Sequence, residues 1–185
     1  MKLLLHICCA PCSIMCIETL RGEGIEPVGF WDNPNIHPFT EFHMRRNTLV
    51  DSAKEIGLSL VVEGGYGLRP FLEAVGGDFD GRCPVCYRLR MRSAARYAAE
   101  NGFTHFTTTL LISPYQNHEL LAQTAREAAQ EFGVSFLYRD FRPSFREGQD
   151  RARAMGLYMQ KYCGCIFSEE DRYRKRKKPP KKEEA

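Results

Sequence analysis

Short apolar runs return at intervals along the chain and predict the strands of a sheet. Residues 2–7 are nearly continuous in apolar side chains, which is typical of a strand buried on both faces in a parallel sheet. Four further runs have strand character and lie at residues 26–31, 58–62, 103–107 and 134–138. The pattern therefore predicts five strands.

Helical periodicity, prolines at helix starts and glycines at helix ends fill the intervals between these runs. The predicted helices cover residues 11–21, 40–56, 71–75, 84–101, 116–132 and 148–155. This alternation predicts an α/β fold with a single doubly wound, mostly parallel five-stranded sheet and helices on both faces. Such a fold is Rossmann-like and resembles that of the adenine nucleotide alpha hydrolases.

The second predicted helix has a clear two-sided pattern. Thr40 is placed to cap its first turn, and Glu41 and Arg45 fall on its polar side. Phe42 and Leu49 fall on the side available to the core. The helix is therefore predicted to have one polar side and one side that packs in the core.

Composition limits the chain to one compact domain. It has 185 residues, of which 43% are hydrophobic and 26% charged. We expect a catalytic domain over residues 1–168 and a basic, flexible tail over residues 169–185. The start of the chain lacks the pattern of a signal peptide, and no apolar run approaches the roughly 20 residues that span a bilayer. We therefore expect a cytoplasmic protein with no membrane partner.

The eight cysteines change this picture because they are clustered. They fall into three groups: Cys8, Cys9, Cys12 and Cys16; Cys83 and Cys86; Cys163 and Cys165. In a reducing compartment such clusters argue against a disulfide framework and favour metal ligands or redox-active thiols.

The predicted topology brings several polar segments to one rim of the sheet. Cys8 and Cys9 follow the first strand, residues 33–35 follow the second, and Thr107–Thr109 end the fourth. In an open parallel sheet these strand ends share one edge, where ligands bind. The rim is therefore the predicted site.

Two cysteine pairs together supply four thiolates. Cys83 and Cys86 have two-residue spacing at a predicted helix start, and Cys8 and Cys9 are adjacent. Four thiolates suit either a four-iron cluster or a structural zinc. Adjacent side chains diverge in regular backbone, so Cys8 and Cys9 can bind one metal centre only if the backbone is irregular there. Alternatively, the two cysteines bind neighbouring centres. A third possibility is that they are small apolar residues of the core.

The remaining cysteines have other expected roles. Cys163 and Cys165 have single-residue spacing, which predicts either a redox-active pair, dithiol or disulfide, or a second metal site completed by Cys12. Cys16 lies one turn after Cys12 and is predicted to pack in the core.

Candidates outside the cysteines are fewer. His37 lies in a turn-rich loop and is the first choice for a functional histidine, while His6 is expected to be a buried structural one. Tyr115 either stacks on a base or packs at the core rim. For contact with RNA phosphates the candidates are the basic residues Arg45, Arg46, Arg82, Arg88 and Arg142.

Taken together, the motifs resemble one family. The matching stretches are Cys8-Cys9-Ala10-Pro11-Cys12-Ser13, Asn33-Pro34-Asn35-Ile36, Cys83-Pro84-Val85-Cys86-Tyr87 with Arg90, Phe106-Thr107-Thr108-Thr109-Leu110 with Ser113-Pro114, and Tyr162-Cys163-Gly164-Cys165 with Ser168. In this order they resemble the cobalamin-independent, iron-sulfur epoxyqueuosine reductases of the QueH type. The resemblance covers residues 3 to 168. One departure is Met159, where the family commonly has arginine.

The resemblance implies an oxidoreductase that deoxygenates epoxyqueuosine to queuosine at the wobble position of tRNA, the final step of queuosine biosynthesis. It implies a [4Fe-4S] cluster on Cys8, Cys9, Cys83 and Cys86. Cys163 and Cys165, with Cys12, would then form the redox pair or bind an additional iron. The implied partners are tRNA carrying epoxyqueuosine and an unidentified electron donor, and either Asp32 or Asp140 would deliver protons.

Two other functions fit part of the sequence. An ATP-dependent enzyme similar to tRNA-thiolation enzymes would use the same sheet, but it needs a glycine- and serine-rich phosphate loop where this chain has residues 8–12. A zinc-stabilised, non-catalytic RNA-binding protein fits the thiols and the basic tail.

Overall fold

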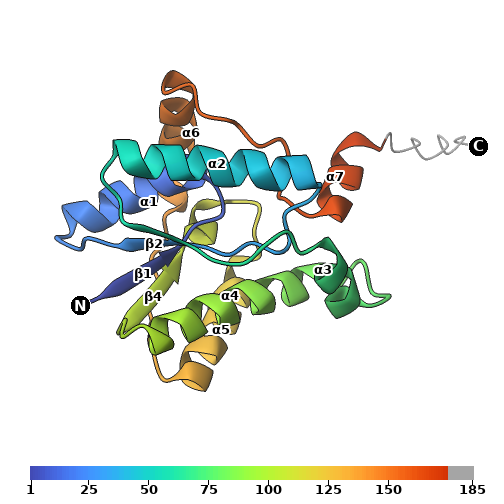
Figure 1. Cartoon of the computed structure of the whole chain (residues 1–185), viewed down its shortest axis with the longest axis horizontal. Helices are drawn as coiled ribbons and strands as arrows, with labels where there is room; N and C mark the ends of the chain where they lie inside the picture. The colour runs from blue at the N-terminus through green and yellow to red at the C-terminus, as the bar shows by residue number, and fades with distance from the viewer. Residues whose placement is uncertain (175–185) are drawn as a thin grey trace, which may run out of the picture.

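The fold is a five-stranded, fully parallel sheet between two layers of helices (Figure 1). It was obtained as a computed structural model, and the structure describes residues 1–174. The strands are β1 (Leu3–His6), β2 (Val28–Trp31), β3 (Leu60–Val62), β4 (His105–Thr108) and β5 (Ser135–Phe136), in the order β3-β2-β1-β4-β5. The predicted fold class and strand number are confirmed.

The central strand β1 has the burial that its composition predicts. Leu3, Leu4 and Leu5 are each at most 1% exposed. Parallel neighbours flank β1 on both sides, with Leu5 in register with Gly29 of β2 and with Thr107 of β4. The end of β1 is therefore fixed from both sides, and so is the segment that leaves it.

Helices cover both faces of the sheet. Their bounds are α1 (Ala10–Gly22), α2 (Phe39–Glu55), α3 (Leu68–Val75), α4 (Arg82–Glu100), α5 (His118–Phe132), α6 (Phe145–Ala154) and α7 (Ile166–Tyr173), with short 3-10 turns η1 (Thr109–Ile112) and η2 (Arg142–Ser144). α1 packs against α2 and α6 on one side, and α4 packs against α5 on the other (Figure 1). Within residues 1–174, no helix is both long and apolar enough to cross a membrane.

The second helix departs from its predicted orientation and cap. α2 begins at Phe39, so Thr40 lies inside it and does not cap it. Phe42 and Leu49 are buried as expected, but Glu41 and Arg45 are buried too. The cause is a distant segment, residues 158–163, which covers this polar side and accepts hydrogen bonds from Arg45. Helical periodicity does not detect such a cover.

The C-terminal part also differs from the expectation. α7 was not predicted, and it continues past residue 168, where we expected the tail to begin. Its start is capped by Cys165, whose sulfur accepts a hydrogen bond from the backbone N–H of Ser168. Phe167 then packs against the buried cluster that includes Phe71. The rest of the expected tail, residues 175–185, lies outside the described residues.

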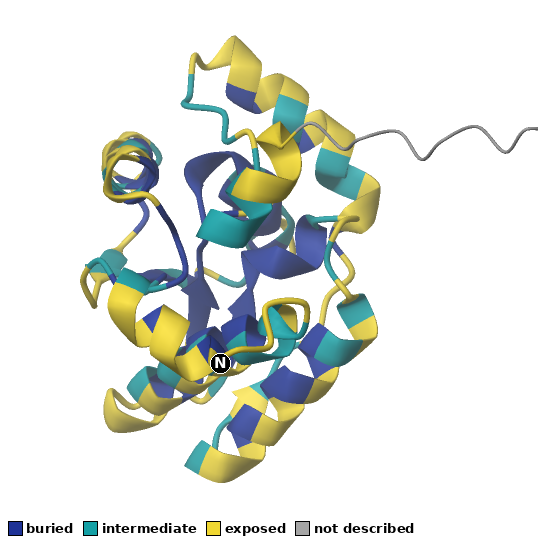
Figure 2. Ribbon diagram, turned by 90° about the vertical axis from the view of Figure 1, so that its right-hand side faces the viewer, coloured by how far each residue is buried: buried dark blue, intermediate teal, exposed yellow. Residues whose placement is uncertain are grey.

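The carboxyl ends of the strands define one side of the molecule. They point toward the region where α3 and α7 lie in Figure 1. Figure 2 turns this side toward the viewer and shows buried strands and connecting loops framed by helices with exposed outer faces. The segments predicted to form the site lie here.

Candidate metal centre and substrate cavity

Three cysteine sulfurs gather where β1 meets α1. The Sγ atoms of Cys8, Cys9 and Cys12 all lie within 4.8 Å of one another, and all three residues are buried. Cys9 is the extended N-cap residue of α1, and its Sγ lies 3.6 Å from that of Cys8. The backbone is therefore irregular here, as a converging vicinal pair requires.

Two polar side chains hold these sulfurs. The Thr109 hydroxyl donates to Cys8 Sγ at 3.5 Å and accepts the Cys8 backbone N–H at 3.2 Å. The Gln160 amide Nε2 donates to Cys9 Sγ at 2.9 Å and to Cys12 Sγ at 3.3 Å. Gln160 is not among the residues predicted from the sequence, because it lies in a loop about 150 residues further along the chain.

Because the three thiols lie close together, their pKa values shift in different directions. Hydrogen bonds from Cys12 and Cys9 lower the pKa of Cys8 well below its usual value. The same contact with Cys8 raises the pKa of Cys12, and burial raises that of Cys9. Cys8 is therefore the first of the three to become a thiolate, which is the form that binds metals.

A buried arginine without a carboxylate partner lies beside these thiols. Arg90 is 2% exposed and donates to Asn33 Oδ1 at 2.7 Å, while Asn33 Nδ2 donates to the Ile7 carbonyl at 2.9 Å. Burial opposes its charge, but interactions with Cys86, then Cys8, raise the pKa of Arg90. Within residues 1–174 it forms no ion pair with a carboxylate. Its charge is therefore available to anionic sulfur ligands.

The second pair of predicted ligands lies at the start of α4. Cys86 is buried next to Cys165 and Phe71, and burial raises the pKa of Cys86 to about 12. Cys83 is exposed. In the described part of the chain, Cys8, Cys9 and Cys12 form the only group of at least three potential metal-ligand atoms that lie close together, and neither Cys83 nor Cys86 belongs to it. The cluster assignment that includes Cys83 and Cys86 therefore stays a prediction.

Cys163 and Cys165 lie in a loop that distant residues anchor. The Arg45 guanidinium donates to the carbonyls of Cys163 and Tyr162, both at 2.9 Å. The backbone N–H of His37 donates to the Gly164 carbonyl at 2.8 Å. Gly164 has φ +149°, a backbone conformation that favours glycine, and a Cβ there would lie 3.3 Å from Ile36 Cγ1.

The two sulfurs of this loop lie in different surroundings. Cys163 is exposed, and its Sγ accepts a hydrogen bond from Gln116 Nε2 at 3.4 Å. Cys165 is buried beside Cys86. All eight cysteines are free thiols.

The predicted packing residues have structural roles. Cys16 is fully buried, and its thiol donates to the Cys12 carbonyl at 3.3 Å. His6 is buried between Thr108 and the Asp32 carbonyl, and burial lowers its pKa to about 3. Both predictions are consistent with this placement.

His37, the first choice for a functional histidine, connects two loops. Its Nδ1 accepts the Ile166 backbone N–H at 3.2 Å and its Nε2 bonds to the Pro34 carbonyl at 3.0 Å. Burial lowers the pKa of His37 to about 4, so the ring is neutral at physiological pH. Both ring nitrogens are thus engaged in holding the loops together.

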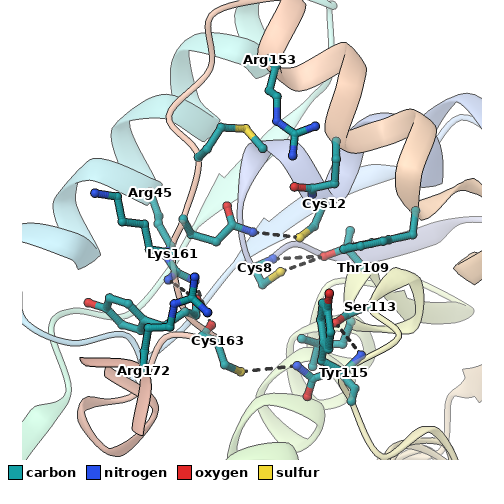
Figure 3. A pocket seen from close by; sticks show the side chains of 17 residues that line it. Cys8, Cys12, Arg45, Thr109, Ser113, Tyr115, Arg153, Lys161, Cys163 and Arg172 are labelled. Carbon is teal, nitrogen blue, oxygen red and sulfur yellow. Dashed lines mark hydrogen bonds between the residues drawn. The ribbon is translucent and has the colours of Figure 1, made fainter. Parts of the chain in front are cut away.

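A cavity of about 700 Å³ opens beside the thiols (Figure 3). Cys8, Cys12 and Cys163 contribute to its lining, as does Met159. Of the five basic residues chosen from the sequence, only Arg45 lines the cavity; Arg153, Lys161 and Arg172 line it as well.

The two carboxylates proposed as proton donors lie elsewhere. Asp32 accepts a hydrogen bond from Ser93 and lines a separate cavity of about 450 Å³. Asp140 forms an exposed ion pair with Arg142, whose guanidinium lowers the pKa of Asp140 to about 2. Within the described residues no carboxylate lines the larger cavity.

Thiols at the ligand-binding edge of a parallel sheet, next to a buried cation and an open cavity, define a Rossmann-like α/β protein with a cysteine group that could bind a metal. The fold itself is similar to that of a solved structure described as a predicted subunit of tRNA methyltransferase from Methanocaldococcus jannaschii. The TM-score is 0.51 at 10% identity, with 83% of this chain and 88% of the other covered.

Sequence comparison identifies the family. A family model described as epoxyqueuosine reductase QueH matches residues 3–171. Three relatives of that name come from Dehalococcoides mccartyi (36% identity, covering 96% of this chain and 98% of the relative), Histophilus somni (33%, 92% and 73%) and Thermotoga maritima (32%, 89% and 88%). The chain therefore belongs to the epoxyqueuosine reductase QueH family and is an oxidoreductase. The comparisons favour neither alternative function.

Proposed function

We propose that this chain reduces epoxyqueuosine to queuosine in tRNA by means of a [4Fe-4S] cluster and an adjacent redox or metal centre. The single observation that carries the proposal is that Cys8, Cys12 and Cys163 line one cavity of about 700 Å³. Sulfur ligands and a space for the substrate therefore adjoin, which a reductase of a modified nucleoside requires.

The donor set fits an iron-sulfur cluster. Cys8, Cys9, Cys83 and Cys86 would hold the cluster, and Cys12, Cys163 and Cys165 would form the redox pair or bind an additional iron. Arg90, whose Nη1 lies 4.0 Å from Cys86 Sγ and whose charge also acts on Cys8, would offset the negative charge of the thiolates. When bound, the cluster supplies single electrons and the additional iron supplies Lewis acidity.

The chain's own side chains orient and enclose the site. Thr109 and Gln160 fix the directions of the sulfurs through their hydrogen bonds. Arg45 holds the loop that carries Cys163 against the cavity. Hydrogen bonds to the sulfurs and burial are known means of tuning a cluster, so these contacts also set how readily electrons leave it.

Protons for the departing epoxide oxygen come from groups other than carboxylates. The proton-bearing groups that line the cavity include the hydroxyls of Thr109 and Ser113. Water entering the open cavity is a further source. Asp32 and Asp140 lie outside this cavity and are therefore not proposed as the proton donors.

The proposed function also indicates the substrate and the cellular compartment of the protein. The relatives are named for epoxyqueuosine, a tRNA nucleoside, so we propose tRNA as the partner and leave the electron donor unassigned. Eight free thiols suit a reducing compartment, which favours the cytoplasm.

The test is turnover by the full chain, reconstituted with iron and sulfide without oxygen and supplied with dithionite. Digested tRNA that carried epoxyqueuosine should yield a nucleoside lighter by one oxygen atom, identified as queuosine by mass spectrometry. Protein kept free of metal is the control and should give no product. Unchanged epoxyqueuosine after incubation with fully loaded protein would rule the proposal out.

A further inference from the structure

The walls of the cavity beside the thiols differ in chemistry. Figure 3 shows Tyr115 on one side, Lys161 and Arg172 on the other, and Cys8 and Cys12 between them. The reacting group of a substrate has to reach the sulfurs. The aromatic and cationic sides of the cavity are then free to contact other parts of the same substrate molecule.

Tyr115 is an exposed aromatic side chain that is held in place by contacts with its neighbours. It is 84% exposed, the largest exposed fraction among the exposed large hydrophobic side chains of the described chain. The Phe145 ring packs edge-on against it at 5.9 Å between centroids, and its backbone N–H donates to Ser113 Oγ at 3.3 Å. One face of a supported ring is a platform on which a nucleobase stacks.

The opposite side carries positive charge. Lys161 and Arg172 are exposed, and within residues 1–174 neither has a carboxylate partner. Arg153, at the edge of the same cavity, is paired with Asp150 at 2.7 Å. Unpaired cations that face an aromatic platform match the phosphates and the base of a single nucleotide strand.

We propose that Tyr115, Lys161 and Arg172 form a subsite for a nucleotide that flanks the reacting one in single-stranded RNA. The flanking base stacks on Tyr115, and its phosphates contact Lys161 and Arg172. This inference rests on the proposed function and deepens it, because it assigns the residues that distinguish a nucleotide in RNA from a free nucleoside. Because Cys8 and Cys12 are buried and Tyr115 is 84% exposed, we assign Tyr115 to a flanking base and not to the reacting group.

Binding of a fluorescent tRNA anticodon stem-loop to the reconstituted protein, followed by anisotropy, tests the subsite directly. Tyr115→Ala should raise Kd by about 5-fold to 140-fold, since a stacked base contributes roughly 1–3 kcal/mol. Tyr115→Phe should bind like the original chain. Arg172→Ala should reduce the slope of log Kd against log salt by about 0.7, the value for one phosphate contact in a single strand.

Matched variants outside the cavity provide the controls. Tyr138 is 39% exposed and Arg126 is exposed on α5, and neither lines the cavity. Tyr138→Ala and Arg126→Ala should leave both Kd and its salt dependence unchanged. If Tyr115→Ala binds the stem-loop as tightly as the original chain, or if the controls weaken binding equally, the subsite assignment is wrong.

Turnover separates this inference from the proposed function. With dithionite as reductant, Tyr115→Ala should lose kcat/KM toward the stem-loop and retain it within about 2-fold toward the free epoxyqueuosine nucleoside. Equal loss with both substrates would place Tyr115 against the reacting nucleoside and overturn the subsite. An intact chain that reduces neither substrate would refute the proposed function, while the binding measurement would still decide the subsite.

Discussion

Cys9→Ser is expected to lose most of its bound iron and to reduce epoxyqueuosine at least about 100-fold more slowly than the original chain. Cys9 belongs to the buried sulfur group, with its Sγ 3.6 Å from that of Cys8 and accepting a hydrogen bond from Gln160 Nε2 at 2.9 Å. A serine hydroxyl is a poor ligand for iron-sulfur clusters. Loss of an outer partner already costs 10-fold to 100-fold, so loss of a ligand costs at least as much. Iron content and turnover of anaerobically purified protein measure the effect.

Cys16→Ala is the matched control for this change. Cys16 is as buried as Cys9 and lies one turn after Cys12, but its thiol bonds only to a backbone carbonyl. We expect it to retain iron and activity and to lose about 1 kcal/mol of unfolding free energy. Iron retained in Cys9→Ser, or lost in Cys16→Ala, would contradict the division of the N-terminal cysteines.

The second large effect is on stability. Arg45→Met should lower the free energy of unfolding by about 3–5 kcal/mol, as measured by urea denaturation. The side chains of Arg45 and Glu41 are 1% and 8% exposed and pair at 2.7 Å. Removing Arg45 leaves the carboxylate buried without its cation and two loop carbonyls without donors.

Two further variants test the cause of that loss. Lys54→Met removes an exposed charge from the same helix, paired with Asp51 at 3.9 Å, and should change stability by less than about 0.5 kcal/mol. Glu41→Gln combined with Arg45→Met should be less destabilised than the sum of the single changes, because neither charge is then left alone. Additive losses would mean that the ion pair is not the cause.

Local sequence patterns were sufficient for the sheet. The run at β1 predicts a strand buried on both faces, and Leu3–Leu5 are buried. The alternation with helices predicts the parallel order, which places Cys8 and Thr109 at one edge, where they are hydrogen-bonded. These features depend on neighbours in sequence or on general rules of topology.

Burial of a helix surface by a segment distant in sequence could not be predicted from local patterns. The burial of Glu41 and Arg45 depends on residues 158–163, which lie more than a hundred positions further on. α7 is short, and its cap is a cysteine sulfur, which is not a usual helix-start signal. Gln160 and the cationic side of the cavity likewise become apparent only when the C-terminal loop is placed over the thiols. The sequence thus predicted the place of Cys8 and Cys9 at the sheet edge better than the residues that surround them.

The measurement that tests the central claim most directly is the metal and acid-labile sulfide content of the full chain purified without oxygen. The account predicts iron and sulfide in nearly equal amounts, about four of each per chain with any excess as additional iron, and the absorbance of an iron-sulfur cluster. Stoichiometric zinc without sulfide would contradict it, and these cysteines would then form a structural zinc site.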